Sequence, residues 1–568
     1  MIDQFLKVAR GEVKADLVIK GKIFSVFSGE ILKTDLAIHD GKIVGIGEYA
    51  GKTTIETDGI VLPGFIDGHI HLESTLLNPL EFTKAVIPHG TTTVFSDPHE
   101  IANILGIEGI KFMVDITESL PLNFYFLAPS CVPAIKGFES YGAEITAEDV
   151  REILKLKRVI GLAEVMNFPG VIYGSSDVLE KISVSKNKVI DGHAPGLVGN
   201  FLNAYIFPGI YSDHECISKD EALEKLRRGM KIMVREGSVA KNLLELAKII
   251  TDHSSENFIL VSDDLLPTDI KECGHMDYRL KLCINAGIKP EIAIKMATIN
   301  TAQYFGIKDI GALAPGFRAD VVIVSDFDTF DVVTTIKDGD IIWNGKKLNI
   351  ELHKPEIPQK ITQTVNMIEI KKNDISIHAK GKTCRLIEIV PNQIITKAST
   401  WDPPIKNGIA FPDPEEDVAK IVVVDRHRQE RKIGVGFVKG FGIKSGAIAS
   451  SVSHDSHNCI SVGVNDSDIV LALKRLKEIQ GGFVVVEDKK IKAELPLQIA
   501  GLMSNLEYNE VVKRLKKCYK AAKDVGILLE HPFTTLSFLA LPVIPELKIT
   551  DYGLVDVKEM RIVDLWVS

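Results

Sequence analysis

Two histidines separated by one residue lie early in the chain, in the segment Gly68-His-Ile-His-Leu-Glu73. On a β-strand, residues two apart point to the same face, so His69 and His71 could bind one metal ion together. A His-x-His pair can equally form a polar strand edge that binds nothing. The pair alone therefore leaves a metal site and a structural role open.

Three further residues of metal-binding type follow much later in the chain: His193, His214 and Asp263. Each stands close to the end of an expected β-strand, as in KVIDGH and FILVSD. If these strands lie side by side, four histidines and one carboxylate converge, and such a set can bind Zn, Fe(II), Mn or Co. Ordinary hydrogen-bonding roles are expected for three other histidines, His89, His253 and His275.

The elements that must position these residues lie between residues 63 and 306, where eight β-rich runs alternate with helical patterns. Eight such units predict a (β/α)8 TIM barrel, which carries its active site at the C-terminal strand ends. The sixth run, AYIFPGIYSDHE, is the weakest because Pro208 interrupts it. The strands are expected to end near His71, Asp97, Ser130, Glu164, His193, His214, Glu236 and Asp263.

Antiparallel β structure is predicted on both sides of this barrel. Apolar and polar residues alternate through residues 16–62, and the same pattern returns at ADVVIVSDF and VVTTIKDGDIIWNGKKL. After the linker HKPEIPQK, strands such as KIVVVDRH and helices such as DIVLALKRLKEI follow one another. We therefore expect an α/β protein with a composite β sandwich over residues 1–62 and 307–354, a barrel over 63–306 and a C-terminal α/β domain over 355–568.

The composition excludes several classes of function. The 568 residues carry a net charge of -9, so the chain lacks the basic excess that binding to a nucleic-acid polymer needs. The seven cysteines form no Cys-x-x-Cys pair, which argues against disulfides or a cysteine-rich zinc site. No signal peptide and no apolar run of about 18 residues is present, which predicts a cytoplasmic protein without membrane contact.

The pattern of a His-x-His on strand one with later His, His and Asp on strands five, six and eight resembles the amidohydrolase superfamily, and the flanking sandwich fits it. Within that superfamily the chain is most similar to the adenine deaminase family, over essentially its whole length. The motifs that carry this similarity are PGFIDGHIHLES, FSDPHEIANILG, GLAEVMNFPGV, DGHAPGL, VREGS, SDD, VSHDSHN and LPLQIAGLMS.

The resemblance implies a bridging carboxylate in the metal site. Many relatives with two metals use a carboxylated lysine on strand four, whereas this chain has Glu164 there. That difference argues against a dihydropyrimidinase or hydantoinase. The alternative is that Glu164 is a structural carboxylate at a strand end. We expect two divalent metal ions per chain, with Mn or Fe(II) favoured and Zn or Co as alternatives.

The reaction that the resemblance implies is hydrolysis of adenine to hypoxanthine and ammonia. A bound metal supplies the nucleophile by lowering the pKa of its water to about 7. Asp263 and Glu164 are the expected catalytic residues, with Asp263 as the general base and Glu164 as the bridge. The expected ligands are His69, His71 and Asp263 for one ion and His193 and His214 for the other, with Glu164 shared.

Residues next to these ligands are candidates for binding the substrate. Asp264 could accept or donate a hydrogen bond at the purine ring, or it could cap the following helix. Glu236 and Ser238 follow strand seven and are expected at the barrel mouth. Arg235 would then point away from the mouth if the strand is regular.

A dense cluster follows the second strand, in Asp97-Pro98-His99-Glu100. We expect His99 to contact the substrate. The cluster could also orient the metal ligands, transfer protons or hold an additional metal. The alternative is a helix start with Asp97 as the N-cap and Pro98 as the first helical residue.

Two other functions remain open. Another amidohydrolase reaction, such as hydrolysis of a cyclic amide or an N-acetyl group, would use the same metal chemistry. A non-catalytic barrel scaffold should have lost ligands, yet all six are present. The motif pair of cytidine-type deaminases, H-x-E with P-C-x-x-C, is absent. The resemblance also implies a homo-oligomer, most simply a dimer, that acts on a small molecule.

The segment 451–458, SVSHDSHN, concentrates polar residues far from the barrel in sequence. Ser, Asp and Asn often bond their own backbone, which favours an ordinary capped loop. The alternative is that the C-terminal domain folds over the barrel mouth and presents His454 and His457 to the substrate or the metal shell.

Overall fold

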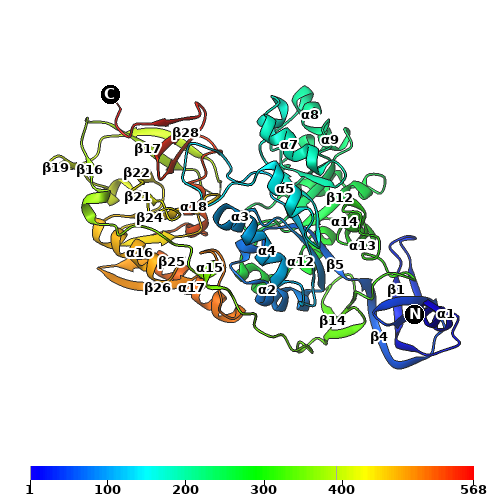
Figure 1. Ribbon diagram of the computed structural model, residues 1–568. Coiled ribbons are helices and arrows are strands. Elements are labelled where there is room, and N and C mark those ends of the chain that lie inside the picture. Colours follow the sequence, from blue (N-terminus) through cyan, green and yellow to red (C-terminus); the bar gives the residue numbers. More distant parts are fainter. Residues whose placement is uncertain (1, 392, 568) are drawn as a thin grey trace.

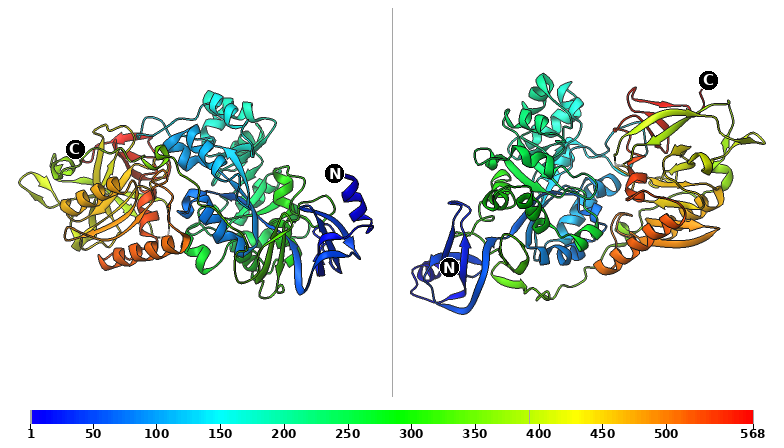
Figure 2. Two further views of the ribbon diagram at one scale, coloured as in Figure 1. Left: turned by 60° about the horizontal axis from the view of Figure 1, so that its bottom comes forward. Right: turned by 180° about the vertical axis from the view of Figure 1, so that it is seen from behind.

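A computed structural model describes residues 2–391 and 393–567 of the chain. Figure 1 shows three regions in a row, with the N-terminal β region at one end, an α/β region in the middle and the C-terminal region at the other end. The two further views of Figure 2 keep the N-terminal and C-terminal regions on opposite sides of the middle region. Residues 350–358 run from the last strand of the β region to the C-terminal region without regular structure.

The middle region contains all eight expected strands, in parallel order. Five of them form one sheet and three form another. The two sheets adjoin at one edge through a parallel bridge between Ile70 and Asp263, and at the other edge Gly192 N donates to Ser212 Oγ at 3.0 Å. The strands are β5 (Phe65–Ile70), β6 (Thr91–Ser96), β7 (Asn123–Ala128), β8 (Val159–Val165), β9 (Val189–Gly192), β10 (Ser212–Asp213), β11 (Lys231–Arg235) and β12 (Phe258–Val261).

Both faces of these strands are largely buried. Every residue of β6 and β12 is buried, as expected for parallel strands between a core and a layer of helices. Inside the ring of strands, Phe95, Met233 and Ile259 belong to one packed cluster, and Phe95 stacks on Phe305 with ring centroids 3.8 Å apart. The interior is therefore a packed core, and the metal-binding candidates gather at the strand ends.

Helices follow these strands along the chain. Several begin where the sequence offers a cap, as at Thr146, whose side chain and that of Asp149 form a capping box. The helices are α2 (Pro79–Val86), α3 (His99–Leu105), α4 (Ile107–Ile116), α5 (Ala147–Ile153), α6 (Phe168–Ile172), α7 (Ser176–Ser185), α8 (Gly199–Ile206), α9 (Lys219–Leu226), α10 (Leu243–Leu246), α11 (Pro267–Glu272), α12 (Met276–Asn285), α13 (Pro290–Met296) and α14 (Ile299–Tyr304).

The sixth strand is much shorter than the sequence run suggested. Tyr205 and Ile206 belong to helix α8, and only Ser212 and Asp213 pair with the neighbouring strand. The apolar run AYIF was therefore wrongly assigned to a strand, because a short apolar run fits a buried helix equally well. The strand end itself was placed correctly, since His214 follows β10 directly.

The two flanking β segments join in one seven-stranded sheet of order β15-β14-β13-β4-β1-β2-β3. The long strand β4 pairs in parallel with β1 over most of its length and antiparallel with β13 at its end. The two segments thus share one continuous sheet, and residues from both of its parts, such as Ile38, Ile43 and Ile336, pack in one apolar cluster. The strands are β1 (Ala15–Phe24), β2 (Ile31–His39), β3 (Lys42–Gly47), β4 (Gly51–Pro63), β13 (Val321–Val324), β14 (Val332–Lys337) and β15 (Asp340–Trp343).

The C-terminal region is built on an eight-stranded sheet of order β18-β17-β22-β21-β24-β23-β25-β26. Helices α16 (Asp466–Glu478), α17 (Tyr508–Asp524) and α18 (Pro532–Phe538) pack against it. The strands of this sheet are β17 (Cys384–Ile389), β18 (Thr396–Trp401), β21 (Val418–Val424), β22 (Ile433–Lys439), β23 (Ala447–Ser450), β24 (Cys459–Gly463), β25 (Gly482–Glu487) and β26 (Lys490–Pro496).

Backbone and side-chain contacts attach the C-terminal region to the middle region. Leu77 forms a parallel bridge with Ser504, and Asn78 Nδ2 donates to the Ser504 carbonyl at 2.9 Å. Tyr508 N at the start of α17 donates to Glu81 Oε2 at 2.8 Å. Contacts of this kind fix the position of one region against the other.

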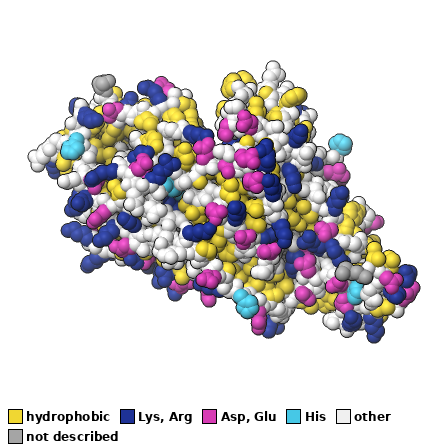
Figure 3. All heavy atoms as spheres, viewed as in Figure 1, with side chains coloured by type: hydrophobic (Ala, Val, Ile, Leu, Met, Phe, Trp, Pro, Cys, Tyr) yellow, Lys and Arg dark blue, Asp and Glu magenta, His cyan; other side chains and the backbone are white. Residues whose placement is uncertain are grey.

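The distribution of surface charge and the length of the helices were compared with what nucleic-acid or membrane partners would need. In the space-filling view of Figure 3, basic and acidic side chains are interspersed over the visible face. Among the described residues, no helix is long and apolar enough to cross a membrane.

We predict that Gly192→Ala destabilises the junction of the two sheets. A Cβ atom at Gly192 would meet the Ser212 carbonyl oxygen at 2.1 Å, so the strands would have to separate. Overpacking of this kind costs about 1–3 kcal/mol of the free energy of unfolding. Thermal unfolding should show a lower midpoint for Gly192→Ala. Gly381→Ala is the control, because its Cβ would meet nothing closer than 3.5 Å. An equal fall of the thermal midpoint in both variants would contradict a close junction of the two sheets at Gly192.

Candidate active site

The two histidines that end strand β5 face each other and a carboxylate. His69 Nε2 and His71 Nε2 lie 3.2 Å apart, and both rings are buried. Asp263 Oδ1 lies 3.2 Å from His71 Nε2 and 3.7 Å from His69 Nε2. The bridge between Ile70 and Asp263 brings the first and last strands together and so creates this contact. These three residues form one group whose ligand atoms could hold a metal ion.

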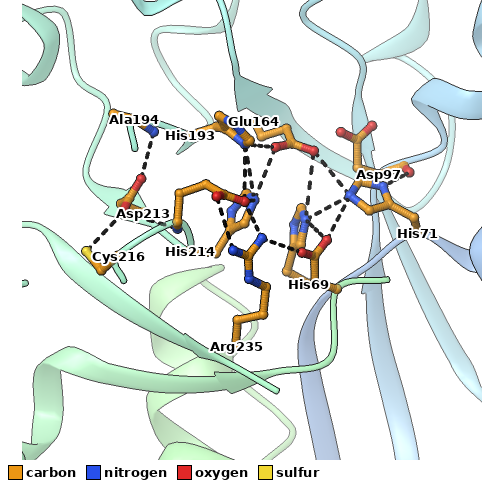
Figure 4. Close-up of polar contacts among 12 residues, drawn as sticks. His69, His71, Asp97, Glu164, His193, Ala194, Asp213, His214, Cys216 and Arg235 are labelled. Atoms are coloured by element: carbon orange, nitrogen blue, oxygen red, sulfur yellow. Dashed lines mark hydrogen bonds and ion pairs between the residues drawn. The ribbon is translucent and has the colours of Figure 1, made fainter. Parts of the chain in front are cut away.

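Glu164 of β8 lies between this pair and a second pair of histidines (Figure 4). Its Oε1 atom is 3.2 Å from His71 Nε2, while Oε2 is 2.6 Å from His193 Nδ1 and 3.2 Å from His214 Nε2. One carboxylate therefore contacts both histidine pairs. The structure brings all six candidate ligands together.

Hydrogen bonding and charge make this site suitable for metal ions. The Asp97 carbonyl oxygen, which can only accept, lies 3.2 Å from His71 Nδ1, so the neutral ring of His71 keeps its Nε2 lone pair free. Burial lowers the pKa of His71, but hydrogen bonds to Asp263 and Glu164 outweigh it and raise that pKa well above its ordinary value, because these carboxylates favour a cation at Nε2, either a proton or a metal ion. The site thus attracts positive charge, and its nitrogen and oxygen donors fit divalent metals.

Arg235 points into the site, contrary to expectation. Its guanidinium donates to Asp263 Oδ2 at 2.8 Å and to both carboxylate oxygens of Glu215. Glu236 instead points away from the cavity and accepts from Leu243 N at 3.4 Å. Neighbouring side chains at the end of β11 do alternate as expected, but Arg235 and not Glu236 is the one that faces the cavity. Glu236 is therefore no longer a candidate for binding the substrate.

Two other substrate-binding candidates, Asp264 and Ser238, line the cavity, and the side chains of both accept hydrogen bonds. Ser74 Oγ donates to Asp264 Oδ1 at 2.5 Å, and Leu266 N donates to Ser238 Oγ at 2.7 Å. Asp264 is not a helix cap, because Leu266 is the N-cap of α11. Burial and the charge of Asp263 raise the pKa of Asp264, which favours its protonated form.

The cluster after β6 is part of the centre. His99 Nδ1 lies 3.0 Å from Asp97 Oδ2 and 3.7 Å from Glu164 Oε1, and its ring is 4.6 Å from that of His71. These four residues form another group able to hold a metal ion. The N-cap of α3 is Pro98 and not Asp97, but Asp97 Oδ1 accepts from His99 N at 3.1 Å, so Asp97 also bonds the first turn of the helix as the alternative expected.

Segment 451–458 reaches the centre from the C-terminal region. His454 and Asp455 line the cavity, and His454 Nδ1 lies 2.6 Å from Glu100 Oε1. His457 Nε2 contacts the other oxygen of Glu100. Asn458 Nδ2 donates to the distant Ser140 carbonyl at 2.8 Å, which is not the local bond of a capped loop. The favoured interpretation of this segment was therefore wrong and its alternative fits.

The remaining histidines lie outside the centre. His89 contacts Asp277 at 2.8 Å, and His275 contacts Thr91 Oγ1 at 2.7 Å. His253 is exposed. These positions agree with the ordinary roles expected for them.

A cavity of about 770 Å³ opens between the two regions at this centre. The middle region supplies its polar side, with the metal-binding candidates and Arg235. The C-terminal region supplies an apolar wall of Phe483, Phe533, Phe538, Leu541, Val543 and Ile544. A polar centre under an apolar wall is the usual form of a small-molecule site.

Comparison with known proteins agrees with this geometry. Residues 60–342 match the amidohydrolase family, and residues 393–561 match the adenine deaminase C-terminal domain. The chain is 45% identical to an adenine deaminase of Dehalococcoides mccartyi over 567 residues, 99% of each chain. It is also 45% identical to an adenine deaminase of Methanothrix thermoacetophila over 571 residues, 100% of each chain. The chain therefore belongs to the amidohydrolase family and, within it, to the adenine deaminases.

Proposed function

We propose that the chain hydrolyses adenine to hypoxanthine and ammonia at a centre of two divalent metal ions. The observation that carries this proposal is the position of Glu164, whose two oxygens contact different histidine pairs. His69, His71 and Asp263 would hold one ion. His193 and His214 would hold the other, with Glu164 between them.

The metals would supply a nucleophile by lowering the pKa of bound water to about 7. Manganese or iron(II) is the proposed occupant by resemblance to the family, and the donors would also accept zinc or cobalt. The two buried carboxylates, Glu164 and Asp263, offset the positive charge that such ions bring into the site.

Asp263 is the proposed general base. Burial would raise its pKa, but the charge of Arg235 and the hydrogen bond to His71 hold that pKa well below its ordinary value. Asp263 is thus ionised and can take a proton from the attacking water and return it to the departing amine, a role typically worth about 10² to 10⁴ in rate. Its Oδ1 atom faces the histidines while Oδ2 faces Arg235.

Asp264 is the proposed contact to the purine. Its raised pKa favours the protonated form, which could donate to a ring nitrogen, while the ionised form could accept from a ring N–H. Ser74 fixes its orientation through the hydrogen bond to Oδ1. Ser238 and His99 also line the cavity and complete the proposed substrate-binding set.

We also propose a division of the chain into three domains. Residues 63–306 form a (β/α)8 barrel, supported by eight parallel strands whose two sheets adjoin at both edges. Residues 1–62 and 307–354 form one β domain around their shared sheet. Residues 355–568 form the domain that covers the cavity.

The substrate assignment predicts which bases release ammonia. Manganese-loaded protein should convert adenine to hypoxanthine with one ammonia each, and adenosine should react poorly because its ribose must enter a site for a free base. Removal of the metal by a chelator should abolish the reaction, and added manganese should restore it. Faster turnover of adenosine or dihydrouracil, or full activity after chelation, would overturn the proposal.

Arg235 should set the acid limb of the pH profile. Arg235→Met removes the positive charge that lowers the pKa of Asp263, so this pKa should rise. Because the ionised carboxylate is required, kcat/KM should then be lost at a higher pH as the pH falls. Loss of such an orienting partner typically costs about 10- to 100-fold in activity or metal affinity. Arg235→Lys keeps the charge and should show a smaller shift. Identical acid limbs for Arg235→Met and the unmodified chain would refute this role.

A further inference from the structure

Glu100 is a carboxylate at the boundary between the barrel and the C-terminal domain, and both of its oxygens have histidine partners. It lies in the first turn of α3 and is buried. His454 Nδ1 lies 2.6 Å from its Oε1 atom, and His457 Nε2 contacts its Oε2 atom. Two histidines of the C-terminal domain thus hold one carboxylate of the barrel.

The hydrogen bonds of His457 show which way the proton points. Ser453 N–H donates to His457 Nδ1 at 3.2 Å, so Nδ1 acts as an acceptor. A neutral imidazole has one N–H, and it must therefore be at Nε2, which donates to Glu100 Oε2. The Nε2 lone pair is then not available to a metal. This cluster is accordingly a hydrogen-bonded clamp on Glu100 and not a separate metal site.

On its other side, Glu100 faces a residue of the metal centre. His99 Nε2 lies 3.4 Å from Glu100 Oε1, and His99 Nδ1 faces Asp97 at 3.0 Å and Glu164 at 3.7 Å. The two ring nitrogens of His99 therefore face different carboxylates, with Glu100 at Nε2 and with Asp97 and Glu164 at Nδ1. Glu100 thereby helps to hold the ring of His99 against the metal centre.

The segment around His457 is shaped to hold this ring in place. His457 has a φ of 55°, in the left-handed region that residues other than glycine rarely occupy, and its N–H donates to the Ser453 carbonyl at 2.6 Å. The ring of His454 stacks on Phe538 with centroids 4.8 Å apart, and His454 N donates to Ser537 Oγ at 3.1 Å. Both histidines are thus fixed by the C-terminal domain itself.

We propose that His457 is a positioning residue of the metal centre, acting through Glu100 on His99. The C-terminal domain thereby completes the environment of the metal ligands as well as covering the cavity. This inference rests on the proposed metal centre. It does not depend on adenine being the substrate, so its failure can be distinguished from failure of the substrate assignment.

The test compares two substitutions that differ in one N–H group. Glutamine can place an N–H close to the position of His457 Nε2, whereas alanine cannot. The variants His457→Ala and His457→Gln are loaded with manganese and dialysed against a graded chelator series, and bound metal per chain is measured. We expect His457→Ala to lose metal affinity by about 10- to 100-fold and His457→Gln to recover most of it.

Three further measurements separate positioning from simple support of the fold. His427→Ala is the matched control, because His427 Nε2 contacts the Ser456 carbonyl in the same segment but does not contact Glu100. It should lower the thermal midpoint while keeping metal affinity. Glu100→Gln should lose metal affinity like His457→Ala, and it serves if His457→Ala does not fold. The KM for adenine should change little in His457→Ala while kcat falls.

Three results would overturn the positioning role of His457. Metal affinity equal to that of the unmodified chain in His457→Ala or in Glu100→Gln would overturn the proposal. Equal loss of affinity in His457→Gln and His457→Ala would also overturn it, because the N–H group would then be irrelevant. Equal loss in His427→Ala would show that only the fold of the segment matters.

Discussion

The contact of one carboxylate with two histidine pairs is the constraint on which the site depends. Glu164 can meet His71 on one side and His193 and His214 on the other only if β5, β8, β9 and β10 bring their C-terminal ends to one place. A parallel arrangement of strands does this, because each strand delivers its last residue to the same edge. The apolar interior below, packed around Phe95, keeps those ends in register.

Burial makes the charges around this contact interdependent. Asp263 is buried and would be costly to ionise alone, yet Arg235 and the histidines offset its charge. Arg235 is in turn held by Glu215. His99 likewise lies against the Glu100 carboxylate, and Glu100 in turn contacts histidines of the C-terminal domain. Each charged group is therefore stabilised by the next, and the domain boundary crosses this network.

The sequence predicted the strand ends well because apolar runs and the polar residues that end them are local features. Five of the six candidate ligands were found in this way, the role of Glu164 came from the family resemblance, and the structure brings all six together. The direction of Arg235 was missed, because which face of β11 points inward depends on its register against β12. A count of alternating residues from the end of the strand cannot fix that register.

Long-range contacts account for the other differences. Helix α8 replaced part of an expected strand, since Tyr205 bonds the Val165 carbonyl and is buried as a helical residue. The role of His454 and His457 could not be read locally, because their partner Glu100 is more than three hundred residues away. The unusual concentration of histidine in segment 451–458 was the one signal that marked it.

The number of metal ions bound per chain, with and without the Glu164 carboxylate, tests the central claim most directly. Elemental analysis of manganese-loaded protein after dialysis should find two ions per chain, and Glu164→Gln should retain about one or fewer because an amide is a much weaker bridge. His89→Gln, outside the centre, should retain two. Retention of two ions in Glu164→Gln at unchanged affinity would contradict a shared carboxylate, as would a single ion in the unmodified chain.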